Sequence, residues 1–301
     1  VKPGEADACV LGVPYDGGIG FRPGTRFGPR AIRDMSTRYA FGEVGSTERG
    51  YYDIDLDRAM LDWPLIVDCG DTDILYLDTD YTFAEITRNV ENIVAAGALP
   101  VVMGGDHSVT FPVVRGLAAS GPFGIVHLDA HLDFKDQVLG VKLGNSSPIK
   151  RASELPFVGP IVSIGTRGIR TSRADFRAGQ ERGNVVVPAQ YVHQHGPAAA
   201  LAQIPDFPRY YLTIDIDVLD PSFAPGTGSP EPDGLPYRYV AEIVRQLASN
   251  YEIVGFDLVE VNPYLDPAQL TALVAARLVV ETLGEVFAGK TGQLRMSRPR
   301  P

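Results

Sequence analysis

Two histidines and four aspartates occur in three short blocks that could together bind metal ions. The blocks are GGDHS at 104–108, LDAHLD at 128–133 and TIDIDVLDP at 213–221. Their candidate ligands are His107, Asp129, His131, Asp133, Asp215 and Asp217. Four carboxylates and two imidazoles can hold two divalent cations that share a water, and such cations lower the pKa of water to near neutrality. The blocks therefore predict a hydrolytic centre with two metal ions.

The types of ligand also indicate which metals the centre would accept. Carboxylates combined with imidazoles suit Mn²⁺, and imidazole also tolerates Ni²⁺, Co²⁺ or Zn²⁺. No thiolate is in the set, which argues against a structural zinc site. Without a cation, so many clustered aspartates and histidines would have a large desolvation penalty. We therefore predict two divalent cations, with Mn²⁺ as the first expectation and Ni²⁺ as the alternative.

Three neighbouring residues have simpler interpretations. Asp106 and Ser108 lie where a helix is expected to begin, and either could cap it. His127 lies inside the apolar run before the second block, so we expect a core or supporting histidine rather than a ligand. We keep His127, together with Asp133, among the candidate catalytic residues.

The elements that must position these blocks follow from the hydrophobic pattern. Near-continuous apolar runs are typical of strands that are covered on both faces of a parallel sheet. The runs lie at 7–13, 64–68, 99–103, 123–128, 161–165, 184–187, 209–214 and 252–257. Helix candidates lie at 29–38, 82–96, 108–119, 171–182, 197–203, 236–248 and 267–288. This alternation predicts an α/β fold with a parallel sheet and helices on both faces.

The candidate ligands all follow the carboxyl ends of predicted strands. His107 follows the strand at 99–103, and the other two blocks follow the strands at 123–128 and 209–214. In open α/β sheets, ligands bind beyond these ends. We therefore expect three strands to bring the six side chains to one edge of the sheet.

The composition narrows the class of protein. The chain has 301 residues and a net charge of -10, so the basic surface of a nucleic-acid-binding protein is absent. No apolar run reaches the roughly 18 residues of a membrane span, and no signal-peptide pattern opens the chain, so we expect a cytoplasmic protein. Cys9 and Cys69 are expected to be buried free thiols. We predict a single domain over 1–290 and a flexible basic tail over 291–301.

Taken together, the blocks resemble the ureohydrolase family, which includes arginases, agmatinases and guanidinobutyrases. The resemblance also includes GVPYDGGIGFRPGTRFGPRAIR at 12–33, DIDVLDPSFAPGTGSPEPDGL at 215–235 and GFDLVEVNP at 255–263, and it is closest to the agmatinase branch. It implies a three-layer α/β/α arginase-like fold with a mostly parallel eight-stranded sheet. It also implies a hydrolase that cleaves a C–N bond of a small cationic guanidino compound to urea and an amine. Homo-oligomers, as trimers or hexamers, are implied as well, and a hetero-oligomer stays open.

The resemblance further implies a division of the ligands between the two cations. One cation would be held by His107, Asp129, Asp133 and Asp215. The other would be held by His131, Asp129, Asp215 and Asp217, with Asp129 and Asp215 bridging. Glu260 matches the family glutamate that pairs with the guanidinium, and a carboxylate is the planar partner that a guanidinium prefers.

The sequence departs from the family in the loop GVKLGNSSPIKRA at 140–152. Many relatives have a histidine here. The nearest match to that histidine in this chain is Asn145 or Ser146, and neither side chain exchanges a proton near neutral pH. Three explanations are open. In the first, another group or the metal-activated water moves the proton. In the second, the substrate is another amidine, such as a biguanide or formiminoglutamate, and in the third, the chain is a weakly active subunit of a hetero-oligomer. We keep Asn145 and Glu260 as candidate catalytic residues, and Asn145, Ser146 and Glu260 as candidate substrate-binding residues.

Charged residues in two other loops have less specific roles. Arg22 and Arg26 are expected to brace the loop at 12–33 rather than bind substrate. Glu231 and Asp233 belong either to a solvated acidic loop or to a site mouth that favours a cationic substrate. Lys135 follows the second metal block and could face the substrate tail.

Overall fold

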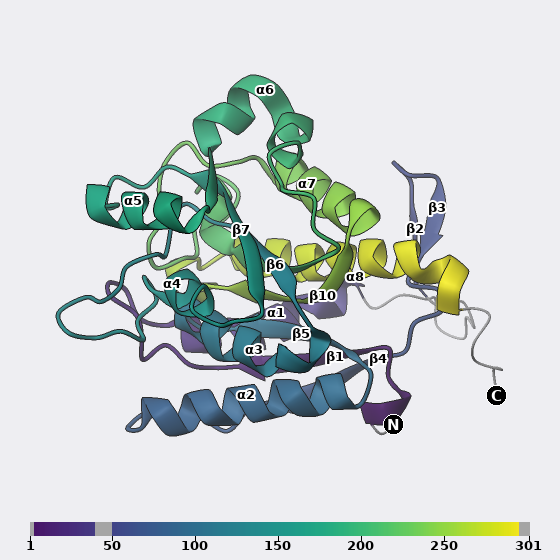
Figure 1. The fold of residues 1–301 in the computed structure, drawn as a ribbon. Helices are drawn as coiled ribbons and strands as arrows, with labels where there is room; N and C mark the ends of the chain where they lie inside the picture. Colours follow the sequence, from purple (N-terminus) through teal and green to yellow (C-terminus); the bar gives the residue numbers. More distant parts are fainter. Residues whose placement is uncertain (1–2, 40–49, 295–301) are drawn as a thin grey trace.

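The computed structural model describes residues 3–39 and 50–294, and an eight-stranded sheet forms its centre (Figure 1). All the neighbouring strands of this sheet pair in parallel, in the order β4-β1-β5-β10-β9-β6-β7-β8. The strands are β1 Ala8–Val13, β4 Ile66–Asp71, β5 Leu99–Gly104, β6 Phe123–Leu128, β7 Val158–Thr166, β8 Val185–Pro188, β9 Arg209–Asp215 and β10 Glu252–Val259. The predicted eight strands are confirmed; the bounds of β6 agree with the prediction, and those of the other seven differ by a few residues.

Helices cover both faces of the sheet, which gives the expected three layers (Figure 1). They are α1 Gly28–Ser36, α2 Thr79–Ala95, α3 Thr110–Gly116, α4 Pro148–Ala152, α5 Arg173–Arg182, α6 Ala189–Leu201, α7 Tyr237–Asn250 and α8 Leu270–Leu294. Side chains of α2, α3 and α4 belong to one buried core, and those of α1, α6, α7 and α8 belong to another. In β1, Ala8 contributes to one core and Cys9 to the other. This alternation across two buried faces explains why central strands such as β1, β5 and β6 are apolar on both sides.

Short elements and one helix start differ from the predictions. The hairpin of β2 Tyr51–Asp53 and β3 Arg58–Met60 and the five-residue α4 are too short to show a period in the sequence. Helix α6 begins before the predicted start at 197, because Gly196 with φ of 81° joins a preceding helical segment to the one that starts at Pro197. Proline in the first turn of that second segment suggested the later start.

Three further predictions concern the edges of the fold. Cys9 is buried as expected, but the burial predicted for Cys69 is wrong, because Cys69 lies on the edge strand β4 and is exposed. None of the described helices is long and apolar enough to cross a membrane. The predicted tail begins inside α8, which continues to Leu294, and its remainder at 295–301 lies outside the described residues.

Candidate active site

Four adjacent strands in the middle of the sheet carry the candidate residues. His107 follows β5, Glu260 follows β10, Asp215 ends β9 and Asp129 follows β6. After β5, the chain next enters the sheet at β6, which is separated from β5 by two strand positions. These positions are occupied by β10 and β9, which come later in the sequence. Parallel sheets bind ligands at such switch points. The three strands predicted from the metal blocks therefore meet, and β10 adds a fourth between β5 and β9.

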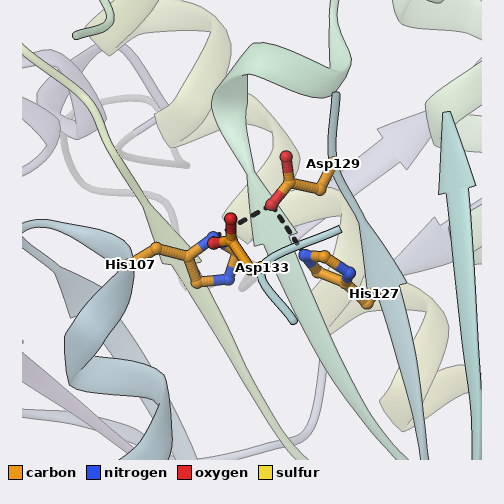
Figure 2. Close-up of side chains that lie close together, drawn as sticks. All are labelled: His107, His127, Asp129 and Asp133. Carbon is orange, nitrogen blue, oxygen red and sulfur yellow. Dashed lines mark hydrogen bonds and ion pairs between the residues drawn. The ribbon is translucent and has the colours of Figure 1, made fainter. Parts of the chain in front are cut away.

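The first cluster surrounds the Nδ1 atom of His107 (Figure 2). This atom lies 3.1 Å from an Oδ2 atom of each of Asp129, Asp133 and Asp215. Donor atoms about 3 Å apart have the spacing of neighbouring ligands around a cation with bonds of roughly 2.1 Å. The structure thus brings together the four side chains that the resemblance assigned to one cation.

The second cluster shares Asp129 with the first. The Nδ1 atom of His131 lies 3.3 Å from Asp129 Oδ1 and 3.2 Å from Asp217 Oδ2. The backbone amide of Asp217 donates to Asp215 Oδ1 at 2.9 Å, which joins the two blocks. Asp129 therefore presents one carboxylate oxygen to each cluster, as a residue that bridges two cations must.

The charges of the two clusters favour bound cations. Burial and the charges of Asp217 and Asp129 raise the pKa of Asp215 well above its usual value. Burial opposes a charge on His107, but hydrogen bonds with Asp129, Asp133 and Asp215 outweigh it and raise the pKa of the imidazole. Both shifts reflect a concentration of negative charge that a divalent cation would offset. The donor set therefore fits two divalent cations in its chemistry as well as in its spacing.

His127 lies behind the first cluster rather than in the cavity. Its Nε2 atom is 2.6 Å from Asp129 Oδ2 (Figure 2). Its Nδ1 atom is 3.0 Å from Ser163 Oγ. The ring is fully buried. These contacts agree with a supporting histidine that orients Asp129, while a catalytic role for His127 stays a prediction.

A buried chain of hydroxyl groups supports His107 on its other side, and the sequence analysis missed it. The Nε2 atom of His107 lies 3.1 Å from Thr213 Oγ1, which lies 3.4 Å from Thr110 Oγ1. Thr110 and Tyr211 both donate to Asp257 Oδ2, at 2.6 and 2.7 Å. Partners of this kind fix the orientation of a histidine ligand. The sign in the sequence is weak: Thr213 and Asp257 are single polar residues inside otherwise apolar strands, and Thr110 lies on a helix.

Arg167 also has a role that was not predicted from the sequence. It follows β7, and its guanidinium donates to the backbone oxygens of Asp217 at 2.7 Å, Glu231 at 2.8 Å and Pro232 at 2.9 Å. These bonds tie the loop at 226–235 to the segment that carries Asp217. Arg167 therefore holds backbone and contacts no carboxylate of the clusters through a described hydrogen bond.

Glu260 stands beside the first cluster with one oxygen engaged. Its Oε1 atom accepts from the backbone amide of His107 at 2.9 Å and from Asn145 Nδ2 at 3.2 Å. Burial and the charge of Asp106 raise the pKa of Glu260 to about 8. Glu260 and Asp133 both have a positive φ, 66° and 47°. Such strain in residues other than glycine concentrates at functional sites.

These residues line a cavity of about 430 Å³, large enough for a small molecule. Asn145 and Ser146 contribute to its wall, together with His131, Asp133, Asp215, Asp217 and Glu260. A neutral amide therefore lies next to Glu260 at the place where relatives were expected to have a histidine. Binding of substrate by Asn145 and Ser146 stays a prediction.

Three charged residues of the loops around the site make structural hydrogen bonds. Arg22 donates to the backbone oxygens of Thr227 and Gly228 at 3.0 and 2.9 Å, and Arg26 Nε donates to Asp16 Oδ1 at 2.5 Å. The predicted bracing roles of both arginines agree with these contacts. Asp106 caps the short helix that begins at His107, since its carboxylate accepts from the backbone amide of Ser108.

Comparisons with known proteins agree with this geometry. The Arginase family matches residues 6–284. Mitochondrial guanidino acid hydrolase of Homo sapiens is 35% identical over 288 residues, which cover 94% of this chain and 79% of that protein. Mitochondrial agmatinase of Gallus gallus is 36% identical over 284 residues, covering 92% and 80%. The structure of proclavaminate amidinohydrolase from Streptomyces clavuligerus superimposes with a TM-score of 0.83 at 31% identity, covering 94% of this chain and 92% of that one.

The similarity extends over nearly the whole chain and includes the strands that carry the two clusters. The relatives act, by their names, on different guanidino compounds. Likeness at this level therefore identifies the family and the arginase-like fold, but does not distinguish between substrates. On the family match and on the sequence identity with these relatives, the chain belongs to the arginase family, the ureohydrolases.

Proposed function

We propose that this chain hydrolyses the C–N bond of a small guanidino compound and releases urea and an amine. Membership of the family makes it a hydrolase of linear amidines. The observation that carries the finer proposal is Glu260, a buried carboxylate beside the first metal cluster and in the wall of the cavity. A guanidinium bound to it would be held next to the metal centre.

We assign the binding of metal ions and the binding of substrate to different residues. His107 and Asp133 would bind one cation, and His131 and Asp217 the other, while Asp129 and Asp215 would be shared by both. Divalent cations in such a site supply a nucleophile by lowering the pKa of water, and we propose Mn²⁺, with Ni²⁺ as the alternative.

Glu260 then orients the reacting group. Its Oε1 atom is held by His107 and Asn145, and the described hydrogen bonds leave Oε2 available to a donor in the cavity. A guanidinium presents parallel N–H groups that pair with carboxylate oxygens. Holding the planar group in one orientation next to the nucleophile removes most of the entropic cost of bringing the two together.

A substrate panel tests the proposal. We expect the purified chain, loaded with Mn²⁺ or with Ni²⁺, to release urea from at least one of agmatine, 4-guanidinobutyrate and arginine. Metal content measured on the same samples should approach two ions per chain. Release of urea from none of the three, by protein with full metal content, would contradict the proposal.

Asn145 favours a second candidate function, the hydrolysis of an amidine that is not a simple guanidine. A neutral amide beside Glu260 can exchange hydrogen bonds with an amidine that is not a simple guanidine. Formiminoglutamate would release formamide, and a biguanide would release guanylurea or urea. Turnover of either compound, without urea release from the first three substrates, would favour this candidate.

The trimeric or hexameric state stays a proposal that mass measurement in solution tests.

A further inference from the structure

The cavity has charges of opposite sign in different parts of its wall. Asp133, Asp215, Asp217 and Glu260 make the part at the metal clusters strongly acidic. The other charged residues of the wall are Lys135, which follows the second metal block, and Arg170 and Asp175, which flank the start of α5. Lys135 Nζ lies 3.3 Å from Asp175 Oδ2, so these two offset each other. Arg170 makes no hydrogen bond or ion pair with any residue that the structure describes, and it leaves this part of the wall with a net positive charge.

Glu231 and Asp233 of the nearby loop lie beside histidines, and no described ion pair joins either of them to Arg170. Glu231 Oε1 lies 3.6 Å from His131 Nε2, and the Asp233 side chain is 83% exposed, with Oδ1 3.7 Å from His193 Nε2. Neither residue belongs to the cavity wall. Asp233 is therefore a solvated residue, whereas Glu231 contacts His131, which lines the cavity, so an acidic site mouth at Glu231 stays open.

The backbone near Arg170 adds to the positive potential. Helix α5 begins at Arg173 with Ser172 as its N-cap, and Thr171 and Asp175 line the cavity. The first turn of α5 therefore borders the cavity, and the N-terminal end of a helix has a partial positive charge. Apolar side chains, including Ile19, Phe21, Val138 and Leu139, also line the wall. They would suit a methylene chain.

We propose that Arg170 determines substrate specificity by binding the carboxylate at the far end of an ω-guanidino acid. This inference rests on the proposed function, since it assumes that the guanidinium binds at Glu260. A guanidinium offers a carboxylate two parallel hydrogen bonds. An ammonium in the same position would meet a like charge, which disfavours a diamine-like substrate such as agmatine.

Three substrates with one spacer chemistry separate the contributions. In 4-guanidinobutyrate the tail ends in a carboxylate, in agmatine it ends in an ammonium, and in butylguanidine it has no charge. We expect the wild-type chain to have its highest kcat/KM with 4-guanidinobutyrate. Arg170→Gln should lower that value by about 10- to 100-fold, mainly through KM, and leave butylguanidine within about threefold. Agmatine should improve relative to 4-guanidinobutyrate.

Two further variants make the result specific to the position. Arg173→Gln removes the same charge from the first residue of α5, which does not line the cavity, and should leave all three substrates unchanged. Arg170→Lys should recover part of the preference for the carboxylate. If urea is released but Arg170→Gln leaves the ratio between 4-guanidinobutyrate and butylguanidine unchanged, the role of Arg170 is overturned and the proposed function stands. If none of the three substrates releases urea, the proposed function fails and this inference fails with it.

Discussion

Replacing Glu260 with glutamine tests the proposed binding of the guanidinium most directly. A glutamine carbonyl in the position of Oε1 would still accept from the His107 amide and from Asn145, now at 2.9 and 3.2 Å. The amide nitrogen would then take the place of Oε2. It would turn N–H donors toward a guanidinium, which has only donors itself. The variant should therefore fold and bind metal normally but bind substrate poorly.

The size of the effect follows from the burial of the pair. Removing one partner of a buried, hydrogen-bonded charge pair costs about 2–5 kcal/mol. Glu260 is only 4% exposed, so solvent screens the pair weakly and we expect about 3–5 kcal/mol. Since 1.36 kcal/mol is a factor of ten, kcat/KM should fall by about 10²- to 10⁴-fold. Urea release at low substrate concentration measures it, alongside metal content and the unfolding temperature.

A matched change elsewhere serves as the control. Asp233→Asn also turns a carboxylate into an amide, on a largely exposed side chain outside the cavity wall. We expect it to keep kcat/KM within about twofold. Glu260→Gln with full metal content and more than a tenth of wild-type kcat/KM would refute the reasoning.

Three other changes probe the metal centre and the sheet edge. Asp129→Ala removes the carboxylate shared by both clusters, so metal content and urea release should fall together; turnover by a metal-free variant would contradict this. Thr213→Val removes the hydroxyl at His107 Nε2 and should weaken metal affinity by about 10- to 100-fold in a chelator competition, whereas Thr213→Ser should not. At the sheet edge, burial opposes ionisation of Asp68, but hydrogen bonds from Arg33 and Gly70 outweigh it and lower its pKa. The stability from this pair is therefore present above the unfolded pKa of about 3.9 and lost as the pH falls below it. Urea unfolding between pH 3 and 6 should show a loss of less than about 1 kcal/mol, because both side chains are partly exposed, and Asp68→Asn should remove it; an unchanged pH dependence in the variant would contradict this.

Much of the fold could be predicted because its sheet is buried on both faces. Strands β5, β6 and β9 are long apolar runs with polar residues directly after them, so both their type and their carboxyl ends were visible in the sequence. The short hairpin β2–β3 and helix α4 were not predicted, because three to five residues are too few to show a period. Cys69 was misjudged because an apolar run does not reveal whether its strand lies at the edge of the sheet.

The sequence alone pointed to the six candidate metal ligands, and its resemblance to the family pointed to Glu260. Their types and spacing restrict the chemistry, and parallel strands bring their carboxyl ends to one edge of a sheet. Only the tertiary structure decided how they combine. The strand order inserts β10 between β5 and β9, which brings Glu260 to the His107 amide, and the fold gives each oxygen of Asp129 to a different cluster.

The surroundings of the site depended on tertiary structure entirely. Thr213 supports His107 and Arg167 holds the loop at 226–235 through contacts between residues 50 or more positions apart. Arg170 likewise has no distinguishing neighbour in the sequence, and only the folded chain places it in the cavity wall. Local spacing therefore determined which side chains can do chemistry, whereas long-range packing decided what supports them and which charges a substrate meets.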